Sequence, residues 1–212
     1  MNNSITNPSH PHRRAPVDNR SIICTNLRLP GLPPRSWTEL MFKKYRGSTL
    51  PQVLFTDPDW FFWAIANHII KHPNALVAEA ELLNIRARRI RIPSLNGRNR
   101  EAEYYFDRTT GKFSHFELVD ANQPQHRGGS RTIRKAVIDL SVVRESRGYD
   151  KLGYKHFLSC LRTVLLGNES ARMTKGRAEA FFDDPVNFYS LVETSSTLAM
   201  RTIPTGKLIS GA

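Results

Sequence analysis

The residues that come closest to a catalytic constellation lie in the segment EAEYYFDRTTGK, residues 101–112. Glu101, Glu103 and Asp107 are carboxylates on one predicted strand, and Lys112 lies across the turn that follows it. Carboxylates beside a lysine are the groups with which a metal-dependent nuclease would hold a divalent cation and stabilise charge on a phosphate. Carboxylates next to arginines are also typical of surface ion pairs, and we favour that interpretation.

Other forms of catalysis have weaker support. The Gly-rich stretch GGSR at 128–131 lacks the Gly-Lys-Ser/Thr ending of a phosphate-binding loop. His10 and His12 are two histidines in a polar segment without periodicity, where solvated side chains are the rule. We therefore expect no catalytic residue, no metal site and no cofactor, and we predict that the protein is not an enzyme.

Charge is the unusual property of the composition. The chain of 212 residues has 31 Lys+Arg against 19 Asp+Glu, a net charge of +12. The excess is clustered: residues 86–100 contain six arginines and no acid. The predicted contact residues are Lys43, Lys44, Arg46, Arg86, Arg88, Arg89, Arg91, Arg98, Arg100, Arg127, Arg131, Arg134 and Lys135.

A surface of this kind predicts a polyanionic partner. The planar guanidinium of arginine suits phosphate, and no motif for sequence-specific base recognition is present. We expect a nucleic-acid-binding protein, with DNA the favoured partner, that acts as an accessory in DNA processing or in a mobile-element or phage complex. The alternatives are an adaptor or inhibitor that binds a host DNA-processing or defence complex, and a metal-dependent nuclease built on the Glu101–Asp107 group.

Cysteine content and hydropathy bear on the compartment. Cys24 and Cys160 are far apart and have no neighbouring cysteine, so we expect two reduced thiols. No apolar run approaches the ~20 residues of a membrane span, and no apolar signal core is present near the N-terminus. These features predict a cytoplasmic protein without a membrane partner.

The elements that must position these residues alternate between helical and strand patterns. FKKY at 42–45 is predicted as a short strand and Gly47 as a turn, followed by a helical turn at 49–55. Asp57 is predicted to be the N-cap, and Pro58 the first residue, of a helix at 58–72. Asn74 is predicted to cap the next helix. Asp150 is predicted to cap a helix at 151–167 that Gly167 ends, another helix is expected at 174–182, and Asp184-Pro185 repeats the Asp-Pro start for a helix that follows it. Strands are expected at 89–93, 102–107, 112–119 and 132–143, with a Thr-Thr-Gly turn joining the second and third as a hairpin.

These patterns predict an α+β fold with an antiparallel sheet of about four strands and helices before and after it. Residues 1–35 should form a disordered basic tail and a Pro-rich linker. A helical module should occupy 36–92. The sheet and C-terminal helices should occupy 93–200 and pack with that module as one domain, and 201–212 should fray.

One short segment resembles a known module. FKKYRGSTLPQVLFTDPDWFFW is similar to the small module at the C-terminus of exodeoxyribonuclease X-like proteins, also found in a quorum-sensing-regulated virulence factor family. The matching residues are Phe42, Lys44, Tyr45, Arg46, Gly47, Leu50, Asp57, Pro58, Trp60, Phe61 and Trp63. Lys43 stands where the family has glycine.

The resemblance covers residues 41–65 only. It implies association with DNA, because the module accompanies DNA-processing domains. The exonuclease domain of that family has four metal-binding acidic residues, the first two spaced Asp-x-Glu on a strand, and no such strand is predicted here. The resemblance therefore does not extend to the nuclease.

Overall fold

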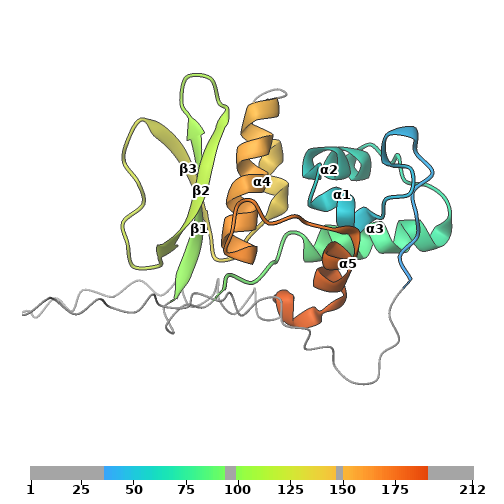
Figure 1. The fold of residues 1–212 in the computed structure, drawn as a ribbon. Helices are drawn as coiled ribbons and strands as arrows, with labels where there is room; N and C mark the ends of the chain where they lie inside the picture. Colours follow the sequence, from blue (N-terminus) through green and yellow to red (C-terminus); the bar gives the residue numbers. More distant parts are fainter. Residues whose placement is uncertain (1–35, 94–98, 147–149, 191–212) are drawn as a thin grey trace, which may run out of the picture.

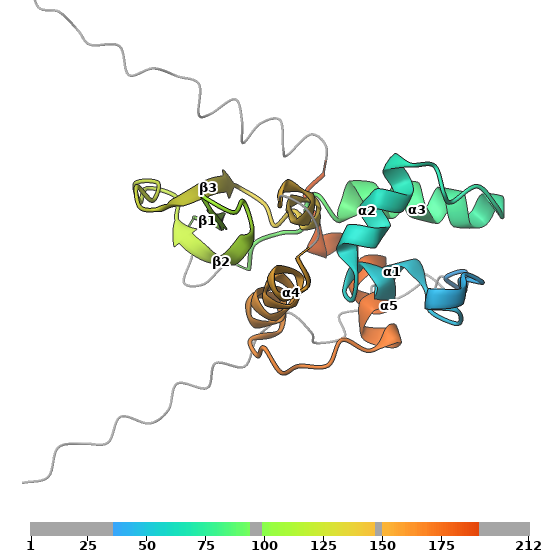
Figure 2. The same cartoon turned by 90° about the horizontal axis from the view of Figure 1, so that it is seen from above.

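The computed structural model describes residues 36–93, 99–146 and 150–190. The predicted tail, linker and frayed C-terminus lie outside these ranges, as do Arg98 and Cys24. Figures 1 and 2 show two halves side by side, one formed by the sheet and α4, the other by α1, α2, α3 and α5. Within the described ranges, no helix has the length and apolar character needed to cross a membrane.

The element bounds confirm an α+β fold. The helices are α1 (Leu50–Leu54), α2 (Pro58–Ala66), α3 (Asn74–Arg86), α4 (Lys151–Leu166) and α5 (Lys175–Asp183), with short 3-10 helices η2 (Lys43–Tyr45), η3 (Leu140–Glu145) and η4 (Pro185–Asn187). The strands are β1 (Arg100–Asp107), β2 (Phe113–Asp120) and β3 (Ser130–Lys135). They form one antiparallel sheet in the order β2-β1-β3.

The sheet has three strands because the predicted strand at 89–93 is not part of it. Ile90 instead makes isolated antiparallel bridges with Ile138 and Phe188 in the helical half. Pro93 lacks the N–H that a longer ladder would need, so the pairing stays local.

One other strand prediction was wrong, and another was too long. Residues 43–45 form the 3-10 helix η2, because the chain from Leu40 to Ser48 closes on itself through a backbone hydrogen bond of 2.8 Å. The predicted strand at 132–143 stops at Lys135 and gives way to η3. Asp139 starts η3, since its carboxylate accepts hydrogen bonds from the backbone N–H and hydroxyl of Ser141.

Most helix boundaries follow the predicted caps. Asp57 accepts from the Trp60 N–H at 3.1 Å, and Asp150 caps α4 through the Leu152 N–H. The helix expected after Asp184-Pro185 was wrong over the described residues: Asp184 caps only the 3-10 helix η4, which ends at Asn187 because Phe188 pairs with Ile90. Gly167 ends α4 in the left-handed conformation, at φ 69°. The predicted cap of α3 was wrong: Pro73 holds that position and Asn74 is the first helical residue.

Helix α2 is shorter than predicted. It ends at Ala66, where the Asn67 side chain donates to the Trp63 carbonyl and His68 takes a left-handed conformation at φ 51°. As a result His68 and Ile69 are exposed rather than on a buried stripe.

The core is continuous between the two halves. Tyr104 contacts Phe116 and Phe106 contacts Phe113, and both of these partner rings pack on Phe157 of α4. In the helical half, Phe55 after α1 packs on Phe181 of α5. One cluster of buried apolar side chains includes all of these residues, so elements from both predicted segments share one core.

Candidate nucleic-acid interface

The basic turn before α1 is tied to the helix that follows it. Lys44 Nζ lies 2.7 Å from Asp57 Oδ2, and Tyr45 Oη donates to the same oxygen at 2.6 Å. The hydrogen bond to Asp57 raises the pKa of Lys44, and burial followed by the Asp57 bond raises the pKa of Tyr45 to about 12. Burial opposes ionisation of Asp57, but the Lys44, Tyr45 and Trp60 donors outweigh it and lower its pKa.

These contacts explain why cations and aromatic rings occur together in this stretch. The Tyr45 ring lies 4.5 Å from the Trp60 ring, so the pair packs η2 against α2 while Lys44 stays 67% exposed at its side chain. Arg46 is exposed, and no partner for its side chain is found among the described residues. Lys43 is the first residue of η2.

Two arginines of the predicted cluster at 86–100 hold the helical half together. The Arg86 guanidinium donates to the Phe182 carbonyl and lies over the Phe188 ring. Arg91 Nε donates to the Phe188 carbonyl at 3.1 Å, and its guanidinium lies 4.3 Å from the centre of the Tyr189 ring. These contacts fasten the end of α3 and the following segment to α5 and η4.

The other members of this cluster differ in exposure. Arg88 is exposed but donates to Asn84 and, at 2.7 Å, to the Ser141 hydroxyl. Arg100 donates to the Pro93 carbonyl. Arg89 is half-buried. Four arginines of the cluster at 86–100, namely Arg86, Arg88, Arg91 and Arg100, therefore donate to protein acceptors.

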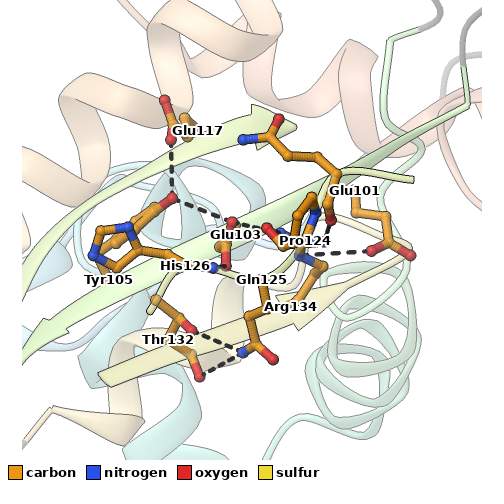
Figure 3. Close-up of polar contacts among 10 residues, drawn as sticks. Glu101, Glu103, Tyr105, Glu117, Pro124, Gln125, His126, Thr132 and Arg134 are labelled. Atoms are coloured by element: carbon orange, nitrogen blue, oxygen red, sulfur yellow. Dashed lines mark hydrogen bonds and ion pairs between the residues drawn. The ribbon is translucent and has the colours of Figure 1, made fainter. Parts of the chain in front are cut away.

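Arg134 lies under a loop rather than on the surface. Its Nη2 is 2.8 Å from Glu103 Oε2 and its Nε is 3.8 Å from Glu101 Oε2. The same guanidinium donates to the carbonyls of Gln123 and Pro124, which belong to the loop between β2 and β3 (Figure 3). Only 13% of the side chain is exposed, so Arg134 anchors the loop and neutralises buried carboxylates.

The rest of this sheet face is also engaged in internal contacts. Tyr105 Oη donates to Glu117 Oε1 at 2.9 Å and lies 3.2 Å from Glu103 Oε2, while the His126 N–H donates to Glu103 (Figure 3). Burial, followed by the bond to Glu117, raises the pKa of Tyr105. Burial opposes ionisation of Glu103, but Arg134 and the His126 N–H outweigh it and lower its pKa.

Two of the three remaining predicted cations, Lys135 and Arg131, are partly engaged. Lys135 Nζ lies 2.5 Å from Asp139 Oδ2, which connects the end of β3 to the start of η3. Arg131 is exposed, lies over the Phe106 ring and donates to the Glu145 carbonyl at 3.1 Å.

The structure does not bring the candidate nuclease residues together. Glu101 and Glu103 are buried beside Arg134, whereas Asp107 is exposed and accepts from Thr110 in the β1–β2 turn. Lys112 is exposed at the other side of that turn. Among the described residues, no group of three or more His, Cys, Asp or Glu side chains is arranged to hold a metal ion.

Exposed cations lie on the elements that meet at one end of the sheet, and we call this set the hairpin-end surface. Ser130 at the start of β3 pairs with Asp107 at the end of β1, and the Phe113 N–H donates to Ser146 just before α4. Figure 1 shows the β1–β2 turn and the start of α4 at the same end of the molecule. The hairpin-end surface consists of Arg108, Lys112, Arg127, Arg131, Lys151 and Lys155, all exposed.

Most of these cations are free to bind a ligand. Apart from Arg131, no hydrogen bond or ion pair of their side chains is found within the described part of the chain. Two acids of this region are directed elsewhere, since Asp107 binds Thr110 and Asp150 caps α4. Glu145 is exposed nearby and reduces the local positive charge.

Four members of this surface were not among the predicted contact residues: Arg108, Lys112, Lys151 and Lys155. Arg108 and Lys112 flank the Thr-Thr-Gly turn, so a hairpin prediction alone places both at its tip. Lys151 and Lys155 are one helical turn apart, which predicts a shared face. What the sequence did not indicate is that this helix begins beside the hairpin turn.

Comparison with known proteins assigns neither a family nor a function, because no protein-family model, curated protein or solved structure matches this chain.

Proposed function

We propose that the protein binds nucleic acid through the hairpin-end surface and does not cleave it. The observation that carries the proposal is that six exposed cations lie on the β1–β2 turn, the β2–β3 loop, β3 and α4, which are elements that meet at one end of the sheet. The net charge of +12 and the resemblance of residues 41–65 to a module of DNA-processing proteins point in the same direction.

The physical basis is the release of counterions from phosphates. If all six cations contact phosphates, affinity should fall by about three decades between 50 and 200 mM salt. Binding of this kind has little sequence preference, because contacts to phosphate carry no base information.

The non-catalytic part of the proposal rests on the carboxylates. Glu101 and Glu103 are buried and face Arg134, whose positive charge disfavours a metal ion beside them. We expect no cleavage of single- or double-stranded DNA with magnesium or manganese. Cleavage that disappears in Glu103→Gln or Asp107→Asn would contradict this and would support a nuclease.

A filter-binding titration at 50 and 200 mM salt tests the binding. The variant Lys151→Ala/Lys155→Ala removes two cations of the hairpin-end surface. The control Lys71→Ala/Arg172→Ala removes two exposed cations elsewhere, with Arg172 beyond the far end of α4. We expect the salt slope to fall by about two units in the first variant and to stay near the wild-type value in the control.

Two outcomes would contradict the proposal. Absence of retention at low salt would exclude a nucleic-acid ligand of ordinary affinity. Equal salt slopes in the two variants would show that nucleic acid does not contact the hairpin-end surface. A protein complex from the native host that survives nuclease treatment would instead favour the adaptor or inhibitor.

A further inference from the structure

The β1–β2 turn is held rigid by its own polar groups. Asp107 Oδ1 accepts from the backbone N–H of Thr110 at 2.6 Å and from its hydroxyl at 2.8 Å. The Gly111 N–H donates to the Asp107 carbonyl, and Gly111 has φ 69°, in the left-handed region that glycine adopts without strain. The Asp107 N–H donates to the Lys112 carbonyl at 2.9 Å and closes the hairpin.

This rigid tip carries cations directed away from the turn's internal bonds. Arg108 and Lys112 are both exposed, and neither side chain has a hydrogen-bond or ion-pair partner among the described residues. The one carboxylate of the turn, Asp107, is occupied by Thr110. The tip is therefore a β-hairpin end that carries two cations on a preorganised backbone, and little backbone conformational entropy would be lost when it binds.

Further cations flank the tip on two neighbouring elements. Arg127 lies in the loop that leads to β3, whose first residue pairs with Asp107. On the other side, Gly153 in the first turn of α4 approaches the Phe113 carbonyl so closely that an added Cβ would lie 3.2 Å from it. Lys151 therefore starts a helix that packs directly beside the hairpin.

We propose that the β1–β2 tip enters the major groove of duplex DNA, while the flanking cations contact the phosphates on either side. The inference rests on the proposed function and adds the class of nucleic acid and the inserting element. The major groove of B-form DNA is about 12 Å wide and admits a two-stranded β-ribbon. The major groove of A-form RNA is too narrow for side chains to enter, so duplex DNA should be preferred over duplex RNA.

The test measures binding of wild type to duplex DNA of about 30 base pairs, to duplex RNA of the same sequence and to the single DNA strand, at one salt concentration. We expect the tightest binding to duplex DNA. A major-groove ligand such as methyl green should displace the protein, and a minor-groove ligand such as netropsin should not. The variant Arg108→Ala/Lys112→Ala should weaken duplex binding about tenfold or more.

The Lys71→Ala/Arg172→Ala variant is the matched control, since it removes the same charge from other surfaces. Far-UV circular dichroism of both variants establishes that the fold is retained. The inference is overturned if single strands or duplex RNA bind as tightly as duplex DNA, if netropsin but not methyl green competes, or if the tip variant binds like the control. In each of these cases nucleic-acid binding itself persists, whereas absence of all binding would refute the proposed function.

Discussion

Arg127 and Arg134 come from the same basic cluster in the sequence but have different surroundings in the fold. Arg127 is exposed and has no polar partner among the described residues. Arg134 faces Glu101 and Glu103 and donates to two loop carbonyls. A guanidinium that neutralises buried carboxylates is needed for stability, while an exposed one can be used for binding.

Replacement of Arg134 by alanine should destabilise the protein strongly. Removing one partner of a buried ion pair leaves the other charges uncompensated, which costs about 3–5 kcal/mol. Arg127→Ala is the matched control and should change the free energy of unfolding by less than about 0.5 kcal/mol. Urea unfolding of both variants measures the difference. Equal stabilities of the two variants would show that Glu101 and Glu103 are tolerated in the folded protein without the charge of Arg134.

At the scale of elements, the aromatic helix α2 has a buried side and a solvent-exposed side. Phe61, Phe62 and Ala64 are buried, and Trp63 is 40% exposed. Phe61 and Phe62 both belong to the common cluster of buried apolar side chains, so their rings anchor this nine-residue helix to the core. The turn before it adds the Lys44 and Tyr45 contacts to its N-cap.

Phe61→Ala should therefore be far more harmful than Trp63→Ala. Truncation of a fully buried phenylalanine costs about 3–5 kcal/mol, a large part of the roughly 5–15 kcal/mol that stabilises a typical domain. Because Trp63 is partly exposed, its side chain buries less apolar surface, and Trp63→Ala should lower the free energy of unfolding by about 1 kcal/mol. Thermal unfolding compares the two. A Phe61→Ala protein as stable as Trp63→Ala would show that α2 does not contribute to the common core.

For the whole molecule, the continuous core makes the two halves depend on each other. Asp59 at the start of α2 pairs with Arg144 of η3 at 2.6 Å, and Trp37 donates to Asp183 at the end of α5. Both contacts join segments that are distant in the sequence, and one cluster of buried apolar side chains includes residues of both halves. The halves should therefore unfold together.

We expect a single cooperative transition. All three tryptophans, Trp37, Trp60 and Trp63, lie in the helical half, so their fluorescence reports that half alone. Far-UV circular dichroism reports the sheet and α4 as well. The two probes should give the same urea midpoint, as a two-state domain requires. A fluorescence transition that precedes the circular-dichroism transition would show that the halves are separate folding units.

Features governed by neighbouring residues were predictable from the sequence. The caps at Asp57, Asp150 and Asp184, the left-handed stop at Gly167 and the Thr-Thr-Gly turn each depend on backbone chemistry within a few residues. The length of α2 was less predictable, because it was decided by a His68 conformation that histidine seldom adopts.

The tertiary structure alone decided which charges are available. Arg86, Arg91 and Arg134 look like surface cations in the sequence, yet each binds a carbonyl or carboxylate from a segment distant in the chain. Arg108 and Lys151, which belong to separate elements, come to one end only because α4 packs on β2. The sequence determined the amount of positive charge and the fold class; long-range packing determined where that charge can meet a ligand, because the burial of an ion depends on partners that local sequence does not specify.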